Sequence, residues 1–142
     1  MFIDHIGIVA PIIDQSIEEW HRVFGYHQLT EVVVNTRQKA KVVFLSKPDS
    51  LTIKLIQPLN NESPIYTYSS RGGGLHHLCF KCDHVQSEIG RLQGLGLRLL
   101  KGPEAGEAFD NHQIAFLYAH DNLNIELIDT PVKASLKQDA AQ

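Results

Sequence analysis

The chain has 142 residues, of which 43% are hydrophobic and 20% charged, a composition typical of one globular domain. Its formal net charge of -3 argues against a nucleic-acid partner, which would require a basic face. No apolar run approaches the roughly 18 residues of a membrane helix, and the start of the chain lacks the cationic region of a secretory signal. We therefore expect a cytoplasmic protein, in which Cys79 and Cys82 are reduced structural thiols.

The first half of the chain predicts a strand, a helix and three further strands. An alternating apolar run at 2–10 predicts the first strand. A helix follows, with Asp14 or Ser16 as its expected N-cap and Gly25 as its end. The three further strands are expected near 28–35, 39–46 and 51–57.

The second half predicts the same elements in the same order. A strand at 74–82 precedes a helix that Asp83 is expected to cap and that Gly94 and Gly96 end. The last three strands are expected near 97–102, 112–118 and 122–129. Each half is therefore predicted to be a βαβββ unit.

A repeat at a fixed offset supports this duplication. Residues 41–56 read KVVFLSKPDSLTIKLI and residues 113–128 read QIAFLYAHDNLNIELI, an offset of 113 − 41 = 72. The two segments share seven identities in sixteen ungapped positions, which indicates a duplicated half rather than a solenoid. We expect one domain over the whole chain. Its parts are half one at 2–57, a linker at 58–72, half two at 73–129, and a polar tail at 130–142 that frays.

Two pairs of polar side chains are related by the same offset. His5 corresponds to His77 in the first strands, and Lys54 corresponds to Glu126 in the last strands, since 77 − 5 = 126 − 54 = 72. If the halves pack with pseudo-twofold symmetry, all four side chains meet at the cleft between them. Burial of the neighbouring apolar residues Ile53 and Leu55 on one strand face would turn Lys54 toward this cleft.

The residues at this cleft suit a metal ion. Glu126 lies in an otherwise apolar strand, where a carboxylate is costly unless it is paired or bound to a metal. Two imidazoles and one carboxylate, His5, His77 and Glu126, are ligands that divalent metals accept with one face left open. The alternative is two structural histidines and a surface glutamate. His112, near the start of a strand beside the cleft, is the remaining candidate for substrate binding, whereas His76 is expected to point away from His77.

At these residues the chain resembles the vicinal oxygen chelate superfamily, and within it the methylmalonyl-CoA epimerases. The resemblance covers residues 2–129 and rests on DHIGIV at 4–9, on PLNNESPI at 58–65 with GGGLHHLCFKCD at 72–83, and on IEL at 125–127. It implies a glyoxalase-like α+β fold, in which two βαβββ modules form a curved, open, mixed cleft resembling a β-barrel. It also implies a divalent metal (Zn, Co, Ni, Mn or Fe) on His5, His77 and Glu126, a small-molecule substrate such as a CoA thioester, and a homodimer as the common assembly.

The chain departs from this family at three places. Relatives often carry a fourth ligand, Gln, Glu or His, where this chain has Lys54. An ammonium about 4 Å from a divalent ion would be repelled by roughly 8 kcal/mol at an effective dielectric near 20. Val42 stands where one bacterial form has a carboxylate base, and the loop at 108–112 lacks the usual small-His-Gly run.

The resemblance therefore implies a metal-dependent epimerase, isomerase or lyase of a small acyl compound, in which the metal stabilises an enolate. Glu126 and Lys54 are the candidate catalytic residues, and Lys54 and His112 the candidate substrate-binding residues. Several alternatives stay open. They are a glyoxalase I-like lactoylglutathione lyase, a three-ligand thiol transferase or extradiol dioxygenase, and a metal-free binding protein of the bleomycin-resistance type.

Overall fold

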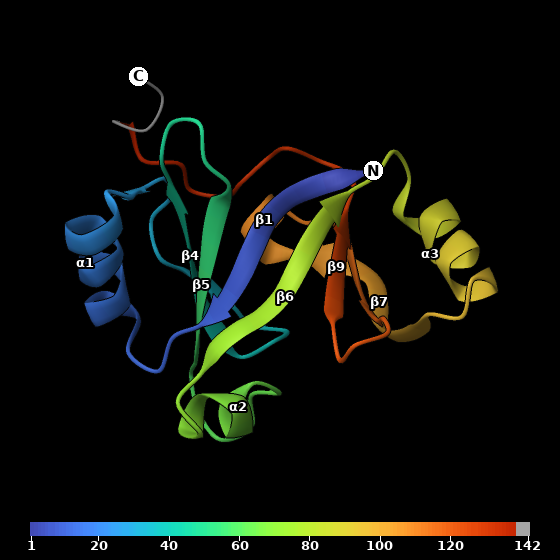
Figure 1. Ribbon diagram of the computed structural model, residues 1–142, viewed down its shortest axis with the longest axis horizontal. Coiled ribbons are helices and arrows are strands. Elements are labelled where there is room, and N and C mark those ends of the chain that lie inside the picture. The colour runs from blue at the N-terminus through green and yellow to red at the C-terminus, as the bar shows by residue number, and fades with distance from the viewer. Residues whose placement is uncertain (139–142) are drawn as a thin grey trace.

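The computed structural model describes residues 1–138, and over this range the chain forms one nine-stranded open sheet with helices on its outside (Figure 1). The strands are β1 (Phe2–Val9), β2 (His27–Gln28), β3 (Val33–Asn35), β4 (Ala40–Ser46), β5 (Thr52–Pro58), β6 (Gly74–Lys81), β7 (Arg98–Gly106), β8 (His112–Tyr118) and β9 (Asn124–Ile128). The helices are α1 (Ile13–Phe24), α2 (Tyr66–Ser70) and α3 (Val85–Gly94), with a 3₁₀ turn η1 (Glu107–Phe109).

The sheet confirms the expected duplication and the α+β class. Its order is β2-β4-β5-β1-β6-β9-β8-β7, with β3 paired to β4. Strand β1 pairs in parallel with β5, and β6 pairs in parallel with β9. The two halves meet where β1 and β6 run antiparallel at the centre of the sheet (Figure 1). The last strand of each half therefore lies directly beside a central strand, one from each side.

Alternation along the strands divides the core into two outer clusters and one inner cluster. On the outer face, α1 covers half one and α3 covers half two, at opposite sides of Figure 1. Leu55 belongs to the cluster under α1, and Leu127 to the cluster under α3. The inner cluster combines apolar side chains of both halves, among them Phe44 and Phe109. Within residues 1–138, no helix is both long enough and apolar enough to cross a membrane.

The predicted N-caps of both long helices are wrong. The N-cap residue of α1 is Ile12 and that of α3 is His84, and neither makes a side-chain capping bond. In α1 a distant group replaces the cap, because the side-chain Oε1 of Gln57 accepts the hydrogen bond of the Ile13 N–H at 2.8 Å. Gly25 ends α1 as predicted, at φ 75°, a left-handed conformation that favours glycine.

Two further details differ from expectation. The single strand expected at 28–35 is divided into β2 and β3, and the linker carries the short helix α2. Part of the expected polar tail packs against the domain. Lys133 and Ala134 are buried, and the N–H of Ala134 donates to the carbonyl of Ala108 at 2.9 Å. Residues 139–142 of the expected tail lie outside the described residues.

The equal packing of the two halves predicts equal responses to cavity formation. Leu55 and Leu127 are repeat equivalents, and both are 0% exposed. Replacing either with Ala should lower the free energy of unfolding by about 2–5 kcal/mol, through lost burial and a residual cavity. Urea unfolding measures this loss. Leu95→Ala is the control, because Leu95 is 63% exposed and its truncation should change stability by less than about 0.5 kcal/mol. A loss at Leu127 no larger than that of the control would contradict this account of the core.

Candidate functional site

Four polar side chains meet on the inner face where the two halves join. His5 on β1, His77 on β6, Lys54 on β5 and Glu126 on β9 are each 0–2% exposed. His5 Nε2 lies 2.9 Å from Glu126 Oε1, and His77 Nε2 lies 3.1 Å from the same oxygen. Lys54 Nζ lies 3.3 Å from Glu126 Oε1 and 3.2 Å from Oε2. The structure thus brings together all four residues that the offset of 72 selected.

Strand register places these side chains. Gly7 pairs with both His77 on β6 and Lys54 on β5. A Cβ at position 7 would overlap the imidazole of His77, so the ring occupies the space that glycine leaves. The repeat-equivalent residue of Gly7 is Cys79, which pairs with His5 and with Glu126. A small residue beside each histidine therefore makes room for the cluster.

Lys54 faces the site because its neighbours face α1. Ile53 and Leu55 are buried in the outer cluster under that helix, which turns the intervening side chain inward. The ammonium lies 5.2 Å from the ring centroid of Phe109 and 6.0 Å from that of Phe44. The expected inward direction is confirmed, and Lys54 is a buried cation between a carboxylate and two aromatic rings.

The surroundings set the protonation states of the cluster. Burial lowers the pKa of His77 to about 3, so its imidazole is neutral near pH 7. Burial also acts to raise the pKa of Glu126, but the charge of Lys54 and the hydrogen bond from His5 outweigh it and hold that pKa well below its ordinary range. The cluster therefore contains an ionised carboxylate beside a neutral imidazole.

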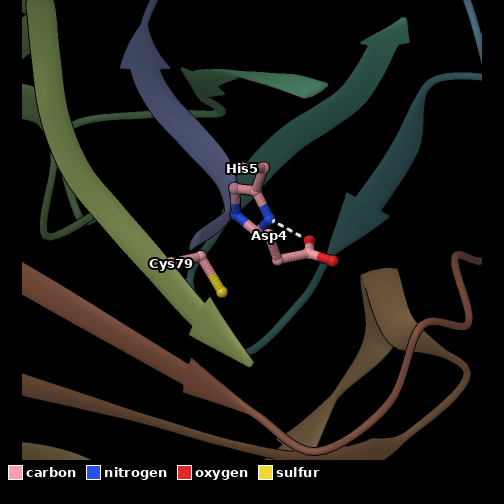
Figure 2. Close-up of side chains that lie close together, drawn as sticks. All are labelled: Asp4, His5 and Cys79. Carbon is pink, nitrogen blue, oxygen red and sulfur yellow. Dashed lines mark hydrogen bonds and ion pairs between the residues drawn. The ribbon is translucent and has the colours of Figure 1, made fainter. Parts of the chain in front are cut away.

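The cluster continues outward through two more residues of the same chain segments. Asp4 Oδ2 lies 2.7 Å from His5 Nδ1 and 3.0 Å from Lys133 Nζ, and Figure 2 shows its carboxylate turned toward the imidazole. On the other side, His76 Nδ1 lies 2.9 Å from His77 Nδ1. His76 was expected to point away from His77 on a regular strand, but β6 is irregular at this position and the two side chains meet. Asp4 and His76 are equivalent positions of the repeat. This equivalence is the sequence signal that could have identified both residues as neighbours of the cluster.

A second group of metal-type ligands overlaps the first. Asp4, His5 and Cys79 also lie close together (Figure 2). Burial raises the pKa of the Cys79 thiol well above its ordinary value, so the sulfur keeps its proton and is a poor ligand. His5, His77 and Glu126 are the better set of donors.

These three donors fit a divalent cation. Two imidazoles and a carboxylate are suitable ligands, and the protonation states of His77 and Glu126 are the ones that ligation requires. Within residues 1–138 His77 Nε2 is buried and makes no aligned hydrogen bond, although Glu126 Oε1 lies 3.1 Å away. A buried polar atom without a hydrogen bond is uncommon, and a bound cation is one way to satisfy it. The ammonium of Lys54 stands beside this group and opposes a dication by charge repulsion.

A hollow of about 310 Å³ lies next to the cluster. Its lining includes His76, Phe116 and Asn124. The Phe116 ring lies 5.8 Å from the ring of His77, centroid to centroid. His112 is not part of this region. It is exposed, and its Nδ1 lies 2.7 Å from the carbonyl oxygen of Phe109, so its role in substrate binding stays a prediction.

The buried ion pair between Lys54 and Glu126 predicts strongly non-additive effects on stability. Glu126→Leu would leave the ammonium of Lys54 buried without an anion and should lower the free energy of unfolding by at least about 3 kcal/mol. Adding Lys54→Met should recover more than half of that loss, because the second change removes the unpaired charge. Urea unfolding in the presence of EDTA measures all four proteins of the cycle.

The control cycle uses Lys39 and Glu62, an ion pair of 2.6 Å whose side chains are 45% and 65% exposed. Replacing these two residues with Gln should give a far smaller coupling, because water screens exposed charges. Additive losses at Lys54 and Glu126 would show that the two charges do not depend on each other.

Known proteins resemble this chain in sequence and in fold. The family model of the Glyoxalase/Bleomycin resistance protein/Dioxygenase superfamily matches residues 4–132. Bacillus subtilis YqjC is 30% identical over 117 residues, which cover 81% of each chain. The mitochondrial methylmalonyl-CoA epimerase of mouse is 26% identical over 121 residues, 84% of this chain and 66% of the mouse protein. The crystal structure of methylmalonyl-CoA epimerase from Mycobacterium tuberculosis superposes with a TM-score of 0.78 at 28% identity, covering 99% of this chain and 91% of that one. The chain therefore belongs to the Glyoxalase/Bleomycin resistance protein/Dioxygenase superfamily.

Proposed function

We propose that this protein is an epimerase of CoA thioesters, which removes and returns the proton on the carbon next to a thioester carbonyl. The buried cluster of His5, His77 and Glu126 carries this proposal, in a chain whose relatives include methylmalonyl-CoA epimerases. Such a reaction needs groups that accept and donate a proton, together with stabilisation of the negative charge that develops on the carbonyl oxygen. The cluster offers both kinds of group.

We propose His5, His77 and Glu126 as the residues that hold a divalent cation. The neutral state of His77, the lack of an aligned hydrogen bond at its Nε2 within the described residues and the ionised state of Glu126 support this assignment. A divalent cation bound there would supply Lewis-acid polarisation of substrate oxygens. Zn, Co, Ni, Mn and Fe all accept such ligands.

Lys54 and Glu126 are the proposed acid and base. Val42, at the position where one bacterial form of the epimerase has a carboxylate, is 1% exposed in the apolar inner cluster and has no proton to exchange. Lys54 Nζ holds protons beside both oxygens of Glu126. When substrate binds, the ammonium can turn from Glu126 to a substrate carboxylate or carbonyl oxygen, because any of these anionic or polar oxygens satisfies the buried charge.

The hollow beside His76 and Phe116 is the proposed place for the acyl group. Its volume of about 310 Å³ matches the smaller end of the size range for ligand pockets. His76 and Phe116, which line it, lie 5.2 and 5.8 Å from the ring of His77, centroid to centroid. A substrate bound here would lie next to the cluster.

One observation favours a second candidate function. The ion pair of Lys54 with Glu126 already compensates the buried carboxylate, as a metal-free site requires. The protein would then be a small-molecule-binding member of the superfamily. Metal content after dialysis against Zn, Co or Ni and gel filtration distinguishes the two functions, because only the proposed epimerase retains close to one ion per chain.

The epimerase proposal predicts hydrogen exchange in the substrate. In D₂O with methylmalonyl-CoA, metal-loaded protein should replace the C2 proton with deuterium faster than a protein-free blank, as followed by ¹H NMR and mass spectrometry. Glu126→Gln and Lys54→Met should each slow the exchange by about 10²-fold or more, because each removes a proposed proton-transfer group.

The matched control for this exchange is Lys47→Met, which removes the same charge at an exposed position. Its exchange rate should equal that of the unchanged protein. Exchange at the blank rate by the metal-loaded protein, with methylmalonyl-CoA and with ethylmalonyl-CoA, would exclude the proposed epimerase.

Lys54 should weaken metal binding. Lys54→Gln removes the repelled ammonium and adds an amide oxygen of the type that some relatives use as fourth ligand. Its affinity for Zn²⁺ or Co²⁺ in isothermal titration calorimetry should rise by at least about tenfold, which corresponds to 1.4 kcal/mol. Lys47→Gln should leave the affinity unchanged. Equal or weaker binding by Lys54→Gln would mean that its ammonium does not oppose the ion.

A further inference from the structure

The two strands that carry His5 and His77 have the same irregularity at equivalent positions. On β1 the pairing with β6 shifts between Ile3 and His5, so that Asp4 is an extra residue. On β6 the pairing shifts opposite Gly7 and Ile8, so that His76 is the extra residue. These are β-bulges, which commonly redirect a side chain beside a functional site. Asp4 and His76 are themselves repeat equivalents, since 76 − 4 = 72.

Each bulge turns a side chain toward the histidine that follows it. In a regular strand, adjacent side chains point to opposite faces and do not meet. Here Asp4 Oδ2 lies 2.7 Å from His5 Nδ1, and His76 Nδ1 lies 2.9 Å from His77 Nδ1. Both contacts involve the ring nitrogen opposite the one that faces Glu126. The duplicated half therefore repeats one arrangement, in which the preceding residue contacts the outer nitrogen of the histidine.

We propose that Asp4 and His76 are positioning residues that each accept a hydrogen bond from Nδ1–H of the next histidine, and thereby direct an unprotonated Nε2 toward Glu126 when a metal ion binds. Ligating histidines commonly donate their other N–H to such an acceptor, which fixes the tautomer and the ring orientation. The direction of the hydrogen bond at His77 therefore rests on the proposed assignment of a metal ion to this cluster.

A metal ion on Nε2 of His77 would select this direction of the hydrogen bond. A ring nitrogen that binds a metal carries no proton, so the one proton of a neutral imidazole is then on Nδ1. His76 Nδ1, at 2.9 Å, is the acceptor in that state, and His76 carries its own proton on Nε2. Without an ion, the ionised Glu126 Oε1 at 3.1 Å favours a proton on Nε2 of His77 instead.

Asp4 is suited to the same role by its charge. It is a partly buried carboxylate, 14% exposed at the side chain, and it also receives a hydrogen bond from Lys133 Nζ at 3.0 Å. A carboxylate offers acceptor atoms, so Asp4 accepts the hydrogen bonds of both contacts. The tail residue Lys133 thus orients Asp4, which in turn orients His5.

The test reads the tautomer of His77 directly. Long-range ¹H–¹⁵N NMR of the ¹⁵N-labelled, Zn²⁺-loaded protein, with His77 assigned by the signals lost in His77→Gln, should show a protonated Nδ1 and an unprotonated Nε2. His76→Leu removes the acceptor and would leave a buried Nδ1–H without a partner when Zn²⁺ binds. In calorimetry the same variant should bind Zn²⁺ about 10–100-fold more weakly. His76→Asp, which copies Asp4, should keep the Nδ1–H tautomer and bind Zn²⁺ within about threefold of the unchanged protein.

The control is His120→Leu, which removes an exposed histidine elsewhere and should change neither the tautomer nor the affinity. An Nε2–H tautomer of His77 in the Zn²⁺-loaded, unchanged protein overturns the proposal, even if His76→Leu does not fold. It is also overturned if the unchanged protein binds no Zn²⁺, or if His76→Leu folds and binds Zn²⁺ as tightly as the unchanged protein. These measurements require no substrate, so a failed exchange assay with the expected tautomer would reject the epimerase and leave the positioning role intact.

Discussion

A fully buried carboxylate at the junction of two half-domains constrains the rest of this structure. Glu126 is 0% exposed within an apolar strand, and such a charge is tolerated only when other groups compensate it. Its compensation comes largely from half one, through Lys54 and His5. Half two cannot bury this side chain by itself, so the electrostatics of the site tie the two halves together along β1 and β6.

This constraint also explains why the repeat is broken at the site. Positions 54 and 126 are equivalent, and two glutamates or two lysines there would bury like charges about 3 Å apart, which is strongly unfavourable. With opposite charges at these positions, the pseudo-symmetric halves can meet without a counter-ion from solvent. The ammonium of Lys54 would also oppose a metal ion on His5, His77 and Glu126, because it lies beside the carboxylate of Glu126. A substrate oxygen that accepts from Lys54 would relieve that repulsion, so substrate and metal would favour each other's binding.

Contacts around the cluster connect Glu126 to residues near the end of the described chain. A chain of polar contacts runs from Lys133 through Asp4 to His5, and from there to Glu126 and Lys54. Phe44 and Phe109 lie against both lysines and exclude water from the chain of contacts. On the His76 side a hollow lies beside the cluster, lined by residues of both halves and of the segment between them.

The sequence alone determined the duplicated architecture and the four clustered residues, because an offset of 72 fixes equivalent positions and strand alternation fixes directions. Burial of Ile53 and Leu55 was sufficient to predict where Lys54 points. Tertiary structure decided the roles of Asp4 and His76, since a β-bulge changes side-chain direction without altering the apolar pattern along the strand. It also decided that Gln57 satisfies the start of α1 and that Lys133 packs inward. Such contacts join residues far apart in the chain, and their partners become known only when the halves are folded against each other.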